Sequence, residues 1–274
     1  MRLFLVCRLR RYFPSVYFFL YSYVLRRRFR LRYFQFQAQV RARLFGPEPN
    51  PIQVLTGPFH GMRYFNETVW DSITTKWVGS YEEELHPIIT ETMKRSYPTV
   101  IDLGCAEGYY AVGLALGMPD TRIWAFDVDM VSRRQCRRLA QLNGVSDRIV
   151  INGRCRPETL NSLHFSEAFV LCDIEGSEVD ILNPLLCPVL LKTDLLVELH
   201  NADHVGMKMD QVLGILQDRF ATTHDAQTIS FTRRMPEKYR HLGVFPASDR
   251  DISVSVDEHR DPAQQWLLLR RRSS

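Results

Sequence analysis

Two carboxylates and two glycines in the first half of this chain are arranged as in a ligand-binding site. Asp102 and Asp127 each end a short apolar run, and Gly104 and Gly108 follow the first of these acids. The glycines allow the backbone to approach a bound molecule closely. Asp127 comes nineteen residues after Gly108, which fits a carboxylate that accepts hydrogen bonds from ribose hydroxyls. The Gly-x-x-x-Gly pattern differs from the Gly-x-Gly-x-x-Gly pattern of NAD-binding folds and disfavours an NAD-dependent enzyme.

A second group of polar side chains accompanies two later apolar runs. Asp173 and Glu175 come after one run, Glu198 lies inside the next, and His200 and Asn201 close it. A carboxylate within an apolar run needs a partner, so Glu198 is either a structural hydrogen-bonding residue or part of the site. His200 is either a tuned base or an ordinary polar residue at a strand end. The five residues can also hold Mg²⁺ or Mn²⁺.

The elements that carry these residues alternate between strand and helix from residue 99 onward. This alternation predicts a parallel sheet with helices on both faces, and ligands bind such a sheet at the carboxyl ends of its strands. The expected strands are 99–103, 122–127, 148–152, 168–173, 194–199, 226–232 and 265–270. The expected helices are 81–95, 107–117, 130–143, 157–163, 177–186 and 205–220, and a small hairpin is expected from 54–56 and 62–65.

The N-terminal arm differs from the rest of the chain in charge. Residues 1–47 carry eleven arginines and no acid, although the whole chain has a net charge of only +4. The aromatic run 12–25 would span about 21 Å as a helix, which is too short for a hydrocarbon core of roughly 30 Å. It is either an interfacial helix on an anionic membrane or, as we expect, a helix that packs on the body of the protein or on a partner.

A cluster of proline and glycine residues marks a boundary between parts of the chain. The cluster at 46–51 ends the arm, because proline does not continue a helix. We expect three parts, namely a basic, aromatic helical extension over 1–50, a hairpin and helix over 51–98, and the main domain over 99–274. The six cysteines form no C-x-x-C pair, which favours reduced thiols and a cytoplasmic protein, with peripheral membrane contact as the alternative.

The strand-end motifs resemble those of class I S-adenosylmethionine-dependent methyltransferases, and most closely the FkbM-like branch. The segments that carry the resemblance are 100–109, 125–127, 172–182 and 197–200. Within the third, Asp-Ile-Glu-Gly-Ser-Glu is similar to the Asp-x-Glu-Gly-Ala-Glu signature of that branch. Asp127 stands where the branch usually has Glu, and Ser177 stands where Ala is commoner. The resemblance covers residues 54–232 and leaves out the arginine-rich arm.

The resemblance implies a Rossmann-like, seven-stranded, mostly parallel sheet whose last strand is antiparallel, with S-adenosylmethionine bound at its carboxyl edge. It assigns six residues to the cofactor, namely Gly104 and Gly108 beneath it, Asp127 at the ribose, Asn152 near the adenine, and Asp102 and Glu107 at the methionine end. The 99–274 part would be the cofactor-binding methyltransferase domain.

The implied reaction is an in-line displacement at the sulfonium methyl, accelerated mainly by positioning. Related branches methylate hydroxyls of sugars and other small metabolites, so we expect O-methylation of a small-molecule or glycan hydroxyl. The candidate bases are Asp173, Glu175 and His200. Catechol-type O-methyltransferases place metal ligands at the ends of the same two strands, but the match here is partial, and we expect a site without metal.

Two other functions compete with this interpretation. In the first, the basic arm clamps the phosphates of a nucleic-acid substrate. The sequence has no Asn/Asp-Pro-Pro-Tyr/Phe motif after the fourth strand and no Pro-Cys pair, which disfavours nucleic acid as the partner. In the second, the protein binds a nucleotide without catalysis and the arm docks a protein partner.

Overall fold

The computed structural model describes residues 37–46, 50–66, 73–165, 167–242, 256 and 262–272. The chain divides into two compact units, residues 1–50 with 243–245 and residues 51–242 with 246–274. In the first unit, residues 37–45 form a helix, and Arg41 donates to the carbonyls of Gly46 and Asn50, each at 2.8 Å. The aromatic run 12–25 lies outside the described residues. Of the helices that the structure describes, none is long and apolar enough to cross a membrane.

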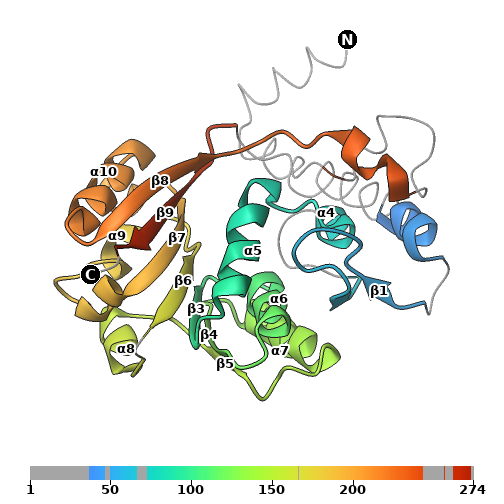
Figure 1. Cartoon of the computed structure of the whole chain (residues 1–274), viewed down its shortest axis with the longest axis horizontal. Coiled ribbons are helices and arrows are strands. Elements are labelled where there is room, and N and C mark those ends of the chain that lie inside the picture. Colours follow the sequence, from blue (N-terminus) through green and yellow to red (C-terminus); the bar gives the residue numbers. More distant parts are fainter. Residues whose placement is uncertain are drawn as a thin grey trace, which may run out of the picture. The chain divides into compact units, whose positions relative to one another are not determined.

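The second unit is built on a seven-stranded sheet with the order β5-β4-β3-β6-β7-β9-β8 (Figure 1). The strands are β3 (Thr99–Leu103), β4 (Arg122–Phe126), β5 (Ile149–Asn152), β6 (Ala168–Cys172), β7 (Thr193–Leu199), β8 (His224–Ser230) and β9 (Gln265–Arg271). The first five pair in parallel, and β9 is antiparallel to both of its neighbours. This Rossmann-like sheet confirms all seven expected strands, each within two residues at either end, and the antiparallel last strand.

Burial explains why the central strands could be recognised in the sequence. Every residue of β3, β6 and β7 is buried, because a parallel sheet covered on both faces makes its central strands near-continuous apolar runs. The edge strand β8 is mostly exposed and correspondingly polar. Figure 1 shows α5 (His86–Arg95), α6 (Tyr109–Gly117) and α7 (Met130–Leu142) on one side of the sheet. On the other side lie α8 (Pro157–Ser162), α9 (Glu178–Ile181) and α10 (Met209–Phe220).

Three expected helices are shorter or divided. The helix expected over 177–186 ends early, at Ile181 of α9, so the prediction was wrong for the residues that follow. Pro184 restricts Asn183 and cannot continue the hydrogen-bond ladder. The helix expected over 205–220 is interrupted at Gly206, whose φ is +68°, so that η4 (Asp203–Val205) precedes α10. The helix expected over 81–95 begins as η2 (Glu83–Leu85) and continues as α5.

The segment before the sheet also differs in detail from expectation. The hairpin exists, but its strands are β1 (Ile52–Gln53) and β2 (Arg63–Tyr64), so the first begins two residues earlier than expected. A short helix that the sequence analysis did not predict, α4 (Ile73–Val78), is buried along its whole length. This helix matters because it brings a charged side chain to the site described below.

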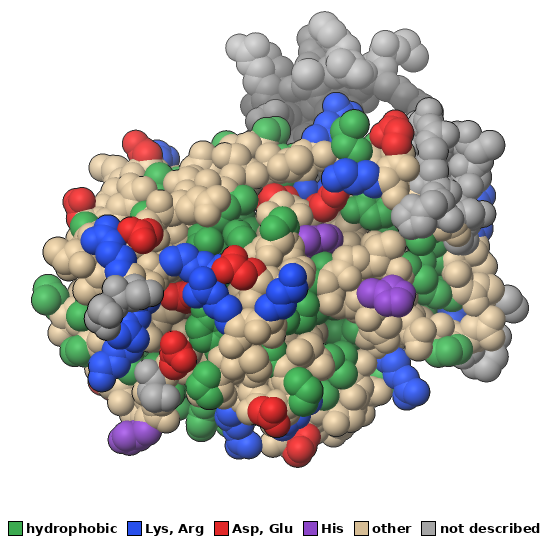
Figure 2. Space-filling view, viewed as in Figure 1, with side chains coloured by type: hydrophobic (Ala, Val, Ile, Leu, Met, Phe, Trp, Pro, Cys, Tyr) green, Lys and Arg blue, Asp and Glu red, His purple; other side chains and the backbone are tan. Residues whose placement is uncertain are grey.

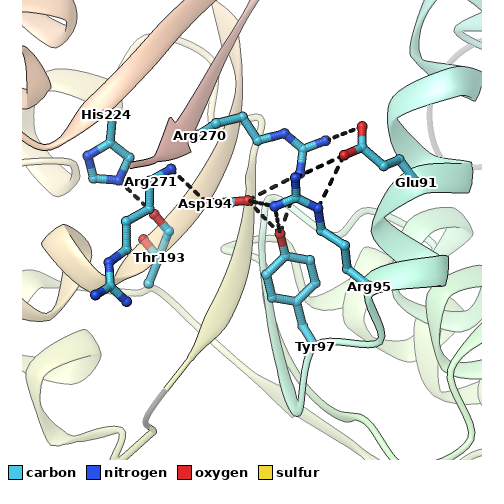
Figure 3. Close-up of polar contacts among 8 residues, drawn as sticks. All are labelled: Glu91, Arg95, Tyr97, Thr193, Asp194, His224, Arg270 and Arg271. Atoms are coloured by element: carbon cyan, nitrogen blue, oxygen red, sulfur yellow. Dashed lines mark hydrogen bonds and ion pairs between the residues drawn. The ribbon is translucent and has the colours of Figure 1, made fainter. Parts of the chain in front are cut away.

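A network of charged side chains fastens α5 to β7 and β9 (Figure 3). The carboxylate of Asp194, near the start of β7, accepts hydrogen bonds from Tyr97 (2.5 Å), Arg95 (3.1 Å) and Arg270 (3.1 Å). Glu91 of α5 in turn pairs with Arg270 at 2.8 Å and with Arg95 at 3.0 Å. Because β7 begins here, the network lies at the end of the sheet opposite the carboxyl ends of the parallel strands.

Candidate functional site

A cavity of about 530 Å³ opens at the carboxyl ends of β3, β4 and β6. Its size lies within the range of small-molecule sites. The side chains that line it include the acids Asp102, Asp127, Asp129, Asp173 and Glu175, the basic residues Lys76 and Arg154, and the aromatic residues Tyr81, Tyr109, Tyr110, Phe126 and Trp266. The cavity therefore combines an apolar, aromatic surface with an excess of negative charge.

The turn after β3 depends on two glycines. Gly104 has a φ of +87°, and a Cβ there would lie 1.6 Å from the carbonyl oxygen of Asp173. Gly108 has a φ of +94°, and a Cβ there would lie 2.7 Å from the sulfur of Cys136. Both positions therefore exclude side chains by conformation and by packing. Gly108 is also the N-cap of α6, so the positive end of that helix dipole lies at the turn that lines the cavity.

Asp102 is a buried carboxylate in the cavity wall. It is 1% exposed, and among the described residues its oxygens make no hydrogen bond of normal geometry, although the backbone N–H of Ala111 in α6 is near enough to lower its pKa in part. Burial raises the pKa of Asp102 to about 8, and the charges of Asp173 and Asp127 act in the same direction. Because an unsatisfied buried carboxylate is costly, this position favours a ligand that brings a positive charge or hydrogen-bond donors.

Hydrogen bonds to the Asp127 carboxylate connect the turn after β3 to the turn after β4. Its Oδ2 accepts from the backbone N–H of Ala106 at 2.9 Å, and its Oδ1 accepts from that of Asp129 at 2.7 Å. Burial raises the pKa of Asp127 even though these two bonds oppose the shift. Each carboxylate oxygen can accept more than one hydrogen bond, so Asp127 is fixed in orientation and can still accept bonds from a ligand in the cavity.

Asp173, Glu175 and His200 meet at the ends of β6 and β7. The Nδ1 of His200 is 2.9 Å from Oε1 of the fully buried Glu178, which also accepts from the backbone N–H of Gly176 at 3.0 Å. The Nε2 of His200 faces Asp173 at 3.8 Å and Glu175 at 3.6 Å. Burial lowers the pKa of His200, but the hydrogen bond to Glu178 and the charges of the other two acids outweigh it, so the pKa is raised.

This second cluster can support two kinds of chemistry. Potential ligand atoms of Asp173, Glu175 and His200 all lie within 4.8 Å of one another, and an oxygen and imidazole set of this kind suits a divalent cation. The same groups can instead accept and hold a proton. The expectation of a site without metal stays a prediction.

Five of the nine predicted site residues line the cavity, namely Asp102, Gly104, Asp127, Asp173 and Glu175. The other four, Glu107, Gly108, Asn152 and His200, do not line it. They adjoin residues that do, and the carbonyl of Asn152 accepts from the backbone N–H of Asp127 at 3.2 Å. The individual roles given to all nine stay predictions.

The sequence analysis missed Lys76, which α4 brings to the cavity wall. Its ammonium forms an ion pair with Oε1 of Glu107, and the hydroxyl of Tyr64 donates to the same oxygen at 2.8 Å. Burial acts to raise the pKa of Glu107, but Lys76 and Tyr64 lower it overall, so Glu107 is ionised. No motif could have revealed Lys76, because its partner lies thirty-one positions away in the sequence.

Comparison with known proteins gives distant likenesses to methyltransferases. No protein-family model matches the sequence. A release factor glutamine methyltransferase from Chlorobaculum tepidum is 32% identical over 126 residues, which cover 42% of this chain and 39% of that protein. The chain therefore matches less than half the length of this curated relative.

The solved structures that align with this chain are likewise only distantly similar to it. The O-methyltransferase TomG from Streptomyces achromogenes aligns with a TM-score of 0.45 and 14% identity over 74% of this chain and 91% of that one. A precorrin-6y C5,15-methyltransferase from Geobacter metallireducens aligns with a TM-score of 0.43 and 11% identity over 69% and 89% of the two chains. Likenesses at this level do not decide function, which must be argued from the site.

Proposed function

We propose that this protein is an S-adenosylmethionine-dependent methyltransferase, of the FkbM-like branch, that methylates a hydroxyl of a small molecule or glycan. The observation that carries the proposal is the buried carboxylate of Asp102 in the cavity wall, two residues from the Gly104 turn that leads into α6. A buried carboxyl with a raised pKa suits a cationic ligand, which would lower that pKa and pair with the ionised carboxylate.

The remaining residues of the cavity fit the same cofactor. Asp127, at the end of β4, would accept hydrogen bonds from the ribose, and Gly153, which follows Asn152 and lines the cavity, would lie against the adenine. Asp102 would balance positive charge at the methionine end. When bound, the cofactor supplies a methyl group activated by a sulfonium centre.

The acceptor hydroxyl must lose its proton during the transfer. Asp173 and Glu175 line the cavity and His200 does not, so we assign the proton to one of the two carboxylates. His200 lies behind them, with its Nε2 3.8 Å from Asp173 and 3.6 Å from Glu175, and these acids and Glu178 raise its pKa. Holding the acceptor oxygen in line with the methyl group provides the rest of the acceleration.

Labelled S-adenosylmethionine and fractionated cell extract test this proposal. We expect the protein to move label into a small-molecule or glycan fraction, and we expect Asp127→Ala to abolish cofactor binding measured by calorimetry. A wild-type protein that is folded and binds neither S-adenosylmethionine nor its demethylated product would overturn the proposal.

A protein acceptor is the second candidate, because the curated relative is a release factor glutamine methyltransferase. Label in the protein fraction would favour it over a small molecule. A nucleic-acid acceptor has less support from the described surface. On the face that Figure 2 shows, acidic and basic side chains of the described residues are interspersed, whereas a nucleic-acid site typically presents a basic stripe.

A further inference from the structure

Lys76 is a buried cation in a cavity whose other charges are mostly negative. Of the described residues that line the cavity, two are basic, and five are acidic. Arg154 is exposed, whereas Lys76 is only 2% exposed. The ammonium lies 4.5 Å from the ring centre of Tyr81 and 5.9 Å from that of Tyr109. These two aromatic rings, which also line the cavity, hold the ammonium in place.

The partner of Lys76 locates it beside the ligand-binding turn. Glu107 lies between Ala106, which lines the cavity, and Gly108, the N-cap of α6. The ammonium that pairs with Glu107 therefore sits next to the amino end of α6. A helix amino end and an ammonium both favour an anion, so two independent features of this wall attract negative charge at one place.

A purely structural ion pair does not explain the arrangement fully. Replacing a buried ion pair by apolar side chains is often neutral or stabilising, so the pair need not be kept for stability. Glu107 is fully buried and does not line the cavity, whereas Lys76 does. Lys76 is thus the member of the pair that a ligand can reach.

We propose that Lys76 binds the α-carboxylate of the methionine part of the cofactor. This inference rests on the proposed function. The same cavity wall carries the Asp102 carboxylate, so together Lys76 and Asp102 complement the opposite charges of an α-amino acid. Lys76 is then a cofactor-binding residue contributed from outside the sheet, and Glu107 is the positioning residue that holds its ammonium.

The test compares S-adenosylmethionine with decarboxylated S-adenosylmethionine, which differs only by the carboxylate. Calorimetry gives both affinities for the wild-type protein and for Lys76→Met combined with Glu107→Gln, a double variant that leaves no unpaired charge buried. We expect the wild-type protein to prefer the carboxylated form by about tenfold to a hundredfold, as a charge-assisted contact predicts. The double variant should bind the two forms about equally.

Asp127→Asn is the matched control, because a weakened ribose contact should lower both affinities alike and leave their ratio unchanged. A double variant that keeps the wild-type preference, or a wild-type protein without a preference, would overturn the role of Lys76. A wild-type protein that binds neither form would instead overturn the proposed function. Circular dichroism of each variant confirms that a lost preference does not come from unfolding.

Discussion

At the scale of single residues, Asp102 couples ligand binding to protonation. Burial, with the nearby charges of Asp173 and Asp127, raises the pKa of Asp102 to about 8. A cationic ligand against this carboxylate lowers its pKa, so we expect binding at pH 7 to release a proton. Calorimetry in two buffers of different ionisation enthalpy measures the release, which Asp102→Asn should abolish. Equal heats in both buffers for the wild-type protein would contradict this expectation.

Asp102 should also make the stability of the ligand-free protein depend on pH. Its folded-state pKa of about 8 lies above the ordinary value of 3.8, so its stabilising contribution is complete below pH 3.8 and is lost as the pH rises through about 8. Asp102→Asn should therefore exceed the wild-type protein in stability at pH 8 by about 1–3 kcal/mol, and by less at pH 6. Urea unfolding at both pH values measures the difference, and Asp120→Asn, an exposed acid, should show none.

Glu178 should control the protonation of His200. It is fully buried and lies 2.9 Å from Nδ1 of the imidazole, so Glu178→Gln keeps a hydrogen-bond acceptor but removes a charge. We expect the pKa of His200 to fall, because the hydrogen bond to an ionised Glu178 raises it, and NMR titration of the imidazole measures the change. Asp180→Asn is the control, because Asp180 pairs with His204 at 2.8 Å on the surface. A His200 pKa that responds equally to both substitutions would contradict a specific role for Glu178.

The site could be predicted from the sequence only where a strand end carried the residue. Asp102, Asp127 and Asp173 each follow an apolar run, and parallel strands bring their carboxyl ends to one edge of the sheet. Lys76 has no such signal, because α4 is only six residues long and is buried along its whole length. Its place beside Glu107 results from tertiary packing, which local patterns do not encode.

At the scale of elements, strands were predicted better than helices. Burial on both faces makes β3, β6 and β7 continuous apolar runs, and their bounds follow directly. Helix ends depend on single residues. Pro184 ends α9 early, and Gly206 separates η4 from α10.

The Asp194 network should stabilise the contact of α5 with the sheet without affecting the site. Removing its carboxylate leaves the partly buried guanidinium of Arg270 and the Tyr97 hydroxyl without their shared acceptor. We expect Asp194→Ala to lower the free energy of unfolding by about 3 kcal/mol in urea titrations, with cofactor affinity unchanged. Asp225→Ala, which removes an exposed pair with Arg272, should cost much less. A loss of cofactor affinity as large as the loss of stability would show that the network also supports the cavity.

At the scale of the whole molecule, charge is divided between the basic N-terminal arm and the acidic remainder of the sequence. The eleven arginines of residues 1–47 are not balanced by any acid in that segment. The described residues that line the cavity, by contrast, all belong to the unit formed by residues 51–242 and 246–274. The basic segment therefore belongs to a different part of the chain from the described lining of the cavity.

This division predicts that the arm and the site can be separated experimentally. The alternative of an interfacial arm predicts that the full chain binds vesicles of phosphatidylcholine and phosphatidylserine, because each basic residue near such a surface contributes about 1 kcal/mol. Binding should weaken steeply between low salt and about 0.5 M salt, since exposed charges are then screened. Deletion of residues 1–50 should abolish vesicle binding in sedimentation assays and leave cofactor affinity unchanged. Equal sedimentation of the full and shortened chains would leave protein docking as the function of the arm, and reduced cofactor affinity would show that the arm contributes to the site.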